Sequence, residues 1–130
     1  MIPTSNNRLG GFGIAVADLD RSATFYRSVF GMVDVATFDL ADMREIVLGF
    51  DGKKSAVLAL MQYVDGSNNN WQGNPIKLVM HVDDAEAIAT SVVEHGGRVT
   101  MPPQVFANFG GAMVGFVTDP DGHRIEIISR

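Results

Sequence analysis

The stretch VADLDRSATFYRSVFGM, residues 16–32, contains the pattern from which the fold can be predicted. An apolar run ends at Asp18, a residue type typical of helix N-caps, and apolar residues then recur at a period near 3.6. Gly31 follows at the place where a left-handed C-cap is favoured. The pattern therefore predicts a helix over residues 19–30 that begins directly after a strand.

The same order of residues returns sixty-six positions later, in the stretch HVDDAEAIATSVVEHGGRV, residues 81–99. Here Asp83 is the predicted N-cap, and Glu86, three residues on, resembles the second half of a capping box. The helix is expected to reach about His95 and to stop at the glycine pair 96–97. Because internal repeats are sought before single motifs, we interpret the chain as two similar halves.

Alternating apolar residues and turn formers predict strands around both helices. They cover about residues 9–16, 33–38, 44–50 and 56–63 in the first half, and 76–82, 98–101, 112–118 and 124–129 in the second. Each half is thus a βαβββ module, over about 8–64 and 76–130, joined by a polar linker over about 65–75. Because neither module is expected to be stable alone, we predict one α+β domain over 1–130, with paired curled sheets around a cavity.

The composition limits the class of partner. Apolar residues make up 46% of the 130 residues, which is enough for a core, and the net charge of −5 disfavours nucleic acid and anionic membrane surfaces. The absence of cysteine excludes disulfides and thiolate metal sites. The start of the chain does not resemble a secretion signal, and no run of about eighteen apolar residues occurs, so we expect a cytoplasmic protein with no membrane segment.

A third stretch, GFVTDPDGHRIEII at residues 115–128, adds an Asp-Pro-Asp-Gly turn followed by an alternating strand with a central glutamate. Together with the two helical stretches, it resembles the vicinal oxygen chelate superfamily, which includes glyoxalase I, bleomycin-resistance proteins and type I extradiol dioxygenases. The resemblance covers nearly the whole chain. It implies a homodimer of paired βαβββ modules, with a cavity that holds a divalent metal through ligands on the first and last strand of each module.

The four ligand positions that the resemblance implies fall on Gly11, Ala59, Lys77 and Glu126. The repeat supports this placement, because Gly11 and Lys77 are again sixty-six positions apart. Of the four, only Glu126 can bind a cation, whereas a divalent ion in an enzyme usually needs about three protein ligands. A protonated Lys77 would also repel the ion. The sequence therefore predicts no metal and no cofactor.

The first strand would present almost no side chain to the cavity, because Gly13 shares a face with Gly11. Glycine inside a strand indicates either the close approach of a ligand or crowding against a neighbouring backbone or subunit. The sequence leaves both explanations open. Ala59, at the matching position of the last strand of the first module, is a further candidate for the cavity wall.

Lys77 and His81 share one face of the predicted strand over 76–82, and Lys77 is expected to point into the same space as Glu126. One interpretation is a structural ion pair that satisfies a buried carboxylate. The other makes Glu126 a general acid or base that acts on a bound molecule beside Lys77. His81 is a candidate for ligand binding deeper in the cavity.

Aromatic residues in two connecting segments are candidates for ligand contact. Phe106 and Phe109 lie in a glycine-ended segment, residues 106–111, which is typical of a flap over a cavity or of an interface patch. Trp71, in the polar linker, has the same two interpretations. Flat apolar side chains of this kind suit an apolar or aromatic ligand.

The predicted function is therefore the binding of a small, mostly apolar organic molecule by a metal-free homodimer. The binding would serve either sequestration or lyase or isomerase chemistry, with Glu126 as the acid or base. The alternative is a metal-dependent lactoylglutathione lyase or ring-cleaving dioxygenase whose ligands lie at positions other than those assigned above.

Overall fold

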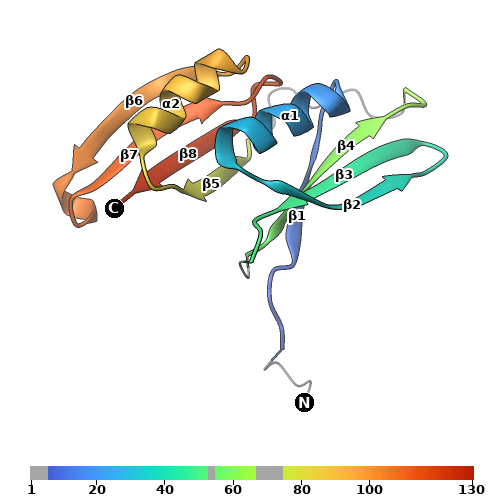
Figure 1. Ribbon diagram of the computed structural model, residues 1–130, viewed down its shortest axis with the longest axis horizontal. Coiled ribbons are helices and arrows are strands. Elements are labelled where there is room, and N and C mark those ends of the chain that lie inside the picture. Colours follow the sequence, from blue (N-terminus) through green and yellow to red (C-terminus); the bar gives the residue numbers. More distant parts are fainter. Residues whose placement is uncertain (1–5, 53–54, 67–74) are drawn as a thin grey trace.

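The computed structural model describes residues 6–52, 55–66 and 75–130 (Figure 1). In the first module the elements are β1 (Gly11–Ala15), α1 (Leu19–Phe30), β2 (Val33–Asp39), β3 (Met43–Gly49) and β4 (Val57–Tyr63). In the second they are β5 (Lys77–His81), α2 (Ala85–Glu94), β6 (Arg98–Phe106), the short 3-10 helix η1 (Ala107–Phe109), β7 (Ala112–Thr118) and β8 (Arg124–Ser129). This order confirms the α+β class and the two βαβββ modules.

Each module forms its own four-stranded sheet, with the same topology in both. The N-terminal sheet has the order β1-β4-β3-β2, and the C-terminal sheet has the order β5-β8-β7-β6. The first strand of each module pairs in parallel with the last, and the other neighbours are antiparallel. Figure 1 shows each helix lying over one face of its sheet, with α1 in contact with α2 between the diverging sheets. No helix in the described ranges is long and apolar enough to span a bilayer.

One hydrophobic core runs under both helices and joins the modules. The helix-facing side chains of the strands alternate with residues on the uncovered face, as the period of two requires. Buried residues from both sheets and both helices belong to a single cluster, which includes Ile14, Leu60, Tyr26, Val92 and Ile127. The uncovered face of each sheet, which we call its open face, is therefore the side left for a ligand or a partner.

The helix ends agree with the sequence in the first module and differ by one residue in the second. Asp18 accepts a hydrogen bond from the backbone N–H of Arg21, and Gly31 closes α1 in the left-handed conformation at φ 72°. In the second module Asp84, and not Asp83, caps α2 by accepting from Ala87. The prediction of Asp83 was wrong because it followed the spacing of a capping box, whereas the offset of sixty-six residues from Asp18 leads to Asp84.

Strand β6 is longer than predicted, because it continues from Arg98 to Phe106 instead of ending near residue 101. Its register with β7 shifts twice, between Val99 and Met101 and between Met101 and Gln104. Such irregularities break the alternation that marks a strand in sequence. Phe106 therefore lies at the end of a strand and pairs with Ala112, and the connection consists of residues 107–111, which include η1.

Gly97 sets how closely α2 approaches the end of β7 and the first module. A Cβ atom at Gly97 would collide with the carbonyl oxygen of Thr118, and it would lie 2.6 Å from Val92 Cγ1 and 3.0 Å from Phe25 Cε1. We expect Gly97→Ala to lower the free energy of unfolding by about 1–3 kcal/mol, because a backbone oxygen cannot move aside freely. Urea unfolding measures the effect.

Gly10→Ala is the matched control for this prediction. A Cβ atom at Gly10 would meet nothing within 4 Å, so that variant should unfold within about 0.5 kcal/mol of wild type. Equal stabilities for the two variants would contradict the close packing at Gly97.

Candidate functional site

The open face of the C-terminal sheet brings Lys77 and Glu126 together. Val79 is the register partner of Glu126 across the parallel pair β5–β8, and Lys77 precedes Val79 by two residues on the same face. Lys77 Nζ lies 2.8 Å from Glu126 Oε1, with the lysine side chain 44% exposed and the glutamate side chain 16% exposed. The carboxylate is thus shielded on most sides but can be reached from the open face.

Two further residues complete this face, and neither was predicted from the sequence as a site residue. Phe116 on β7 is the register partner of Glu126, and Arg124 on β8 precedes Glu126 by two residues. The guanidinium carbon of Arg124 lies 4.4 Å from the centre of the Phe116 ring, and Lys77 Nζ lies 5.9 Å from it. The parity of β8 would have indicated Arg124. We use the name anion face for Lys77, Phe116, Arg124 and Glu126.

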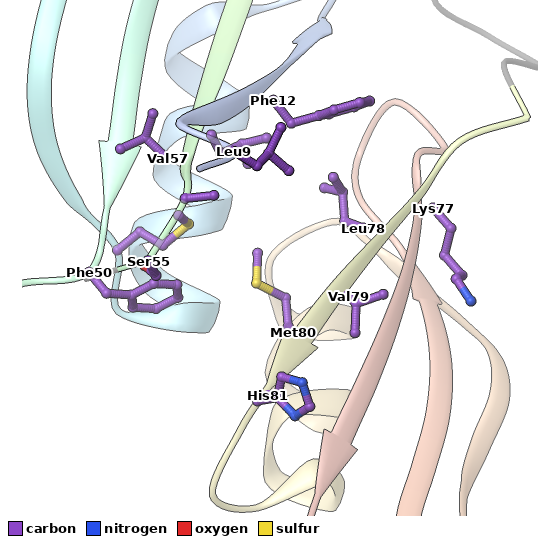
Figure 2. A pocket seen from close by; sticks show the side chains of 13 residues that line it. Leu9, Phe12, Phe50, Ser55, Val57, Lys77, Leu78, Val79, Met80 and His81 are labelled. Carbon is purple, nitrogen blue, oxygen red and sulfur yellow. The ribbon is translucent and has the colours of Figure 1, made fainter. Parts of the chain in front are cut away.

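A cleft of about 530 Å³ lies between the two modules, along the exposed edge of β5. Figure 2 shows Leu78 and Met80 extending from β5 toward the side of the cleft that carries Phe12 and Phe50, while Lys77 points away from it. Its lining residues are Leu9, Phe12, Met32, Phe50, Ser55, Ala56, Val57, Leu58, Lys77, Leu78, Val79, Met80 and His81. The cleft therefore suits an apolar group, and Lys77 and His81 border it.

Gly11, Gly13 and Ala59 lie on the open face of the N-terminal sheet and do not line this cleft. Gly13 and Ala59 are register partners in the parallel pair β1–β4. A Cβ atom on Gly11 would lie 2.6 Å from Val57 Cγ2, and one on Gly13 would lie 3.1 Å from the end of the Met61 side chain. Packing inside the sheet therefore requires a glycine at position 11. A role of Gly11, Gly13 and Ala59 in ligand binding stays a prediction.

The aromatic candidates lie apart from the cleft or outside the described ranges. Phe106 and Phe109 contact each other, with ring centres 5.9 Å apart, at the junction of β6 and η1. Neither of them lines the cleft, and Phe109 is 54% exposed. Trp71 falls outside the residues that the structure describes. Their roles in ligand binding stay predictions.

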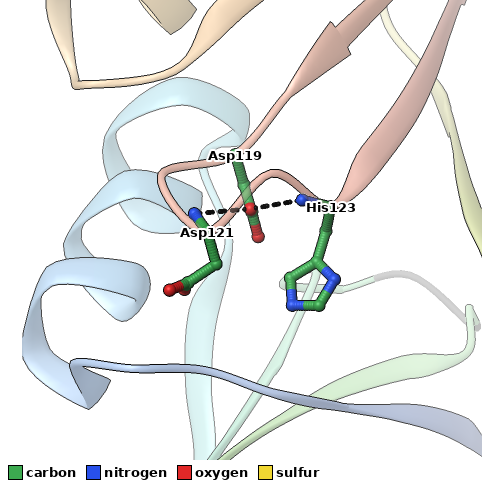
Figure 3. Close-up of side chains that lie close together, drawn as sticks. All are labelled: Asp119, Asp121 and His123. Carbon is green, nitrogen blue, oxygen red and sulfur yellow. Dashed lines mark hydrogen bonds between the residues drawn. The ribbon is translucent and has the colours of Figure 1, made fainter. Parts of the chain in front are cut away.

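The turn between β7 and β8 holds a second cluster of polar side chains, which we call the junction cluster: Asp119, Asp121 and His123. All three are buried, and one potential ligand atom of each lies within 4.8 Å of the others. Figure 3 shows the Asp119 carboxylate accepting hydrogen bonds from the backbone N–H groups of Asp121 and His123, both at 2.9 Å. These bonds shape the turn that starts β8.

The junction cluster is bound to the first module. Asp119 Oδ2 accepts from the Tyr26 hydroxyl at 2.7 Å, and Asp121 accepts from the Ser22 hydroxyl at 3.1 Å and from the Arg21 guanidinium at 2.9 Å. Burial raises the pKa of Asp119, and burial together with the charge of Asp119 raises the pKa of Tyr26 well above its usual value. The phenol therefore keeps its proton and donates a hydrogen bond to the carboxylate.

The paired βαβββ modules, with their open sheet faces, define an α+β protein of the glyoxalase fold. Residues 8–127 match the family model described as the Glyoxalase/Bleomycin resistance protein/Dioxygenase superfamily, and the chain belongs to that superfamily. This confirms the resemblance found in the sequence.

Named relatives come from bacteria, plants and protozoa. The lactoylglutathione lyase of Haemophilus influenzae is 32% identical over 118 residues, which cover 88% of this chain and 87% of that protein. A lactoylglutathione lyase of Arabidopsis thaliana is 31% identical over 88% of this chain, but the match spans only 41% of that protein. Among solved structures, the trypanothione-dependent glyoxalase I of Leishmania major has a TM-score of 0.77 at 25% identity, covering 95% of this chain and 87% of that one.

The prediction of no metal and no cofactor was wrong. Relatives at about 30% identity are lactoylglutathione lyases, which are metal-dependent, and the junction cluster is a possible metal-binding group. The prediction considered only the four strand positions, where Gly11, Ala59 and the paired Lys77 leave Glu126 as the one candidate ligand. The signal that it missed is the alternation Asp-x-Asp-x-His at residues 119–123.

The junction cluster has the donor types and the free lone pairs that a divalent cation requires. Oδ2 of Asp119 and Oδ2 of Asp121 each accept one hydrogen bond, so each keeps a further lone pair. His123 Nε2 lies 2.8 Å from the carbonyl oxygen of Ala15, so Nε2 carries the proton and Nδ1 is the acceptor in the neutral ring. A histidine whose other nitrogen donates to a backbone carbonyl is the usual arrangement of a metal ligand.

Proposed function

We propose that this protein is a lyase of the glyoxalase superfamily, which acts on a small organic molecule held at the anion face, with Glu126 as the acid–base group. The observation that carries the proposal is the Glu126 carboxylate, which is shielded yet accessible and ion-paired with Lys77 at 2.8 Å. The similarity to lactoylglutathione lyases over 88% of the chain supports an enzyme over a simple carrier. The homodimer and the cytoplasmic location stay predictions.

In this proposal Glu126 accepts a proton from an activated carbon of the substrate and returns it at a neighbouring atom. The ion pair with Lys77 holds the carboxylate in one orientation, and the ammonium group offers positive charge to an oxygen on which negative charge develops. The junction cluster, whose side chains are buried against α1, would hold a divalent ion that supplies positive charge to its two carboxylates and stabilises the turn before β8. The apolar cleft beside β5 would receive the unreactive part of the molecule.

The sequestration of an apolar compound is a second candidate function. The cleft of about 530 Å³ favours it, because Leu78, Met80, Phe12 and Phe50 offer apolar surface with few polar groups. A carrier would bind its ligand in the cleft and release it unchanged.

An assay of lactoylglutathione formation tests the enzyme proposal. Protein purified without chelator is incubated with methylglyoxal and glutathione, formation of the lactoylglutathione thioester is followed, and bound metal is measured by elemental mass spectrometry. We expect turnover, about one divalent ion per chain, and loss of both after treatment with EDTA, with recovery on adding Zn²⁺, Ni²⁺ or Mn²⁺. No turnover with any of these ions would contradict the proposal for this substrate and favour sequestration.

A further inference from the structure

Arg124 lies on the anion face. Among residues 6–52, 55–66 and 75–130, its guanidinium group has no carboxylate partner. It is exposed at the start of β8, and its guanidinium carbon lies 4.4 Å from the centre of the Phe116 ring. A guanidinium held over an aromatic ring is partly ordered before any ligand arrives, and its N–H groups remain available as donors. Arg124 is thus positioned to donate hydrogen bonds to an anion.

The charges around Arg124 favour an anion at this place. Lys77 and Glu126 form a pair at 2.8 Å and cancel each other formally, so Arg124 leaves the anion face with a net positive charge. The chain as a whole carries a net charge of −5. A local positive site on an acidic protein attracts a small anion, whereas the overall charge repels large polyanions.

We propose that Arg124 binds the carboxylate group of the substrate, which is therefore a small organic acid with an apolar body. The planar guanidinium can form two parallel hydrogen bonds with a carboxylate, and this geometry fixes the direction of the ligand. The Phe116 ring and the side chain of Val79, which is 47% exposed, would contact the apolar body.

The spacing along β8 connects the carboxylate to the reactive position. Arg124 and Glu126 are two residues apart on one face, which corresponds to roughly 7 Å along the strand. A molecule whose carboxylate is bound by Arg124 can therefore present a C–H bond a few atoms away to the Glu126 carboxylate. This inference rests on the proposed role of Glu126 and adds the substrate class to it.

Three probes of similar shape test the inference: phenylacetate, its neutral amide phenylacetamide, and the cation 2-phenylethylamine. Each is titrated into wild type, Arg124→Met and Arg44→Met at low salt, and binding is followed by calorimetry or by NMR shifts. Arg44→Met is the matched control, because it makes the same change in net charge at a residue paired with Asp39 on the N-terminal sheet. Thermal unfolding of each variant checks that the fold is kept.

We expect phenylacetate to bind wild type at least about ten-fold more tightly than phenylacetamide, since one charge-assisted pair contributes on that scale, and 2-phenylethylamine to bind most weakly. Arg124→Met should remove the preference for the acid, and Arg44→Met should keep it. Equal affinities for acid and amide in wild type, an equal loss in both variants, or no saturable binding of phenylacetate would each overturn the inference.

The outcome separates this inference from the proposed function. A lack of phenylacetate binding together with lactoylglutathione formation would overturn the carboxylate site alone. Arg124-dependent binding of phenylacetate without lactoylglutathione formation would leave the carboxylate site standing and contradict the enzyme proposal for that reaction.

Discussion

Glu126→Gln is expected to lower kcat by about 10²–10⁴-fold, the usual contribution of a general acid or base. The amide keeps the size of the side chain but cannot take up a proton, so the loss should fall on kcat and leave KM nearly unchanged. The amide oxygen can still accept a hydrogen bond from Lys77, whose Nζ lies 2.8 Å from Glu126 Oε1 in the wild type. Steady-state kinetics of lactoylglutathione formation, or of the reaction found in its place, measures the effect.

Two further variants test whether the loss of activity comes from the Glu126 carboxylate itself. Glu86→Gln, on the exposed first turn of α2, makes the same change in charge away from the anion face and should retain wild-type kinetics. Glu126→Asp keeps a carboxylate but withdraws it by one methylene, so it should recover part of the activity that the glutamine variant loses. Full activity in Glu126→Gln would show that Glu126 is not the acid–base group.

The order of elements could be predicted from the caps of α1 and from the internal repeat. A cap depends only on neighbouring residues, and the repeat transfers the same pattern to the second half. The offset of sixty-six residues also locates the cap of α2 at Asp84, although a capping-box spacing pointed to Asp83. The register between strands that are distant in the sequence could not be predicted in this way. Strand β6 continues to Phe106 through two register shifts, and the second of them spans Pro102 and Pro103, which cannot donate to a strand ladder.

Strand parity predicted the pairing of Lys77 with Glu126, because it needs only the period of two on β5 and β8. The same parity places Arg124 on this face, although its position is not one of the four ligand positions that the resemblance implies. The stacking of Arg124 on Phe116 depends on the pairing of β7 with β8 and on side-chain conformation. This contact between Arg124 and Phe116 therefore cannot be predicted from a local sequence pattern.

The junction cluster could not be assembled from the sequence because its partners lie about a hundred residues away. The Tyr26 hydroxyl and Asp119 are separated by 93 positions, and the backbone N–H of Ala17 and Asp121 by 104. In the sequence, Asp119 and Asp121 indicate only a turn. The fold adds their burial and their contacts with α1, which make the turn a connection between the modules.

Asp119→Ala is expected to lower the free energy of unfolding by about 3–5 kcal/mol, the largest effect on stability that we predict. The substitution removes the acceptor for the Tyr26 hydroxyl and for the backbone N–H groups of Asp121 and His123, at a residue only 2% exposed. Each donor would then be buried without its partner. Urea unfolding followed by circular dichroism measures the change.

Asp119→Asn and Tyr26→Phe keep the prediction testable if the alanine variant does not fold. The asparagine oxygen can still accept from both backbone N–H groups, and Tyr26→Phe removes only the hydroxyl. We therefore expect each variant to lower the free energy of unfolding by about 1–2 kcal/mol. Because the two side chains share the hydrogen bond of 2.7 Å, the double variant should lose less than the sum of the single losses. Tyr63→Phe, at a tyrosine outside this cluster, should stay within about 0.5 kcal/mol of wild type. Additive losses at Tyr26 and Asp119 would mean that their hydrogen bond does not hold the two modules together.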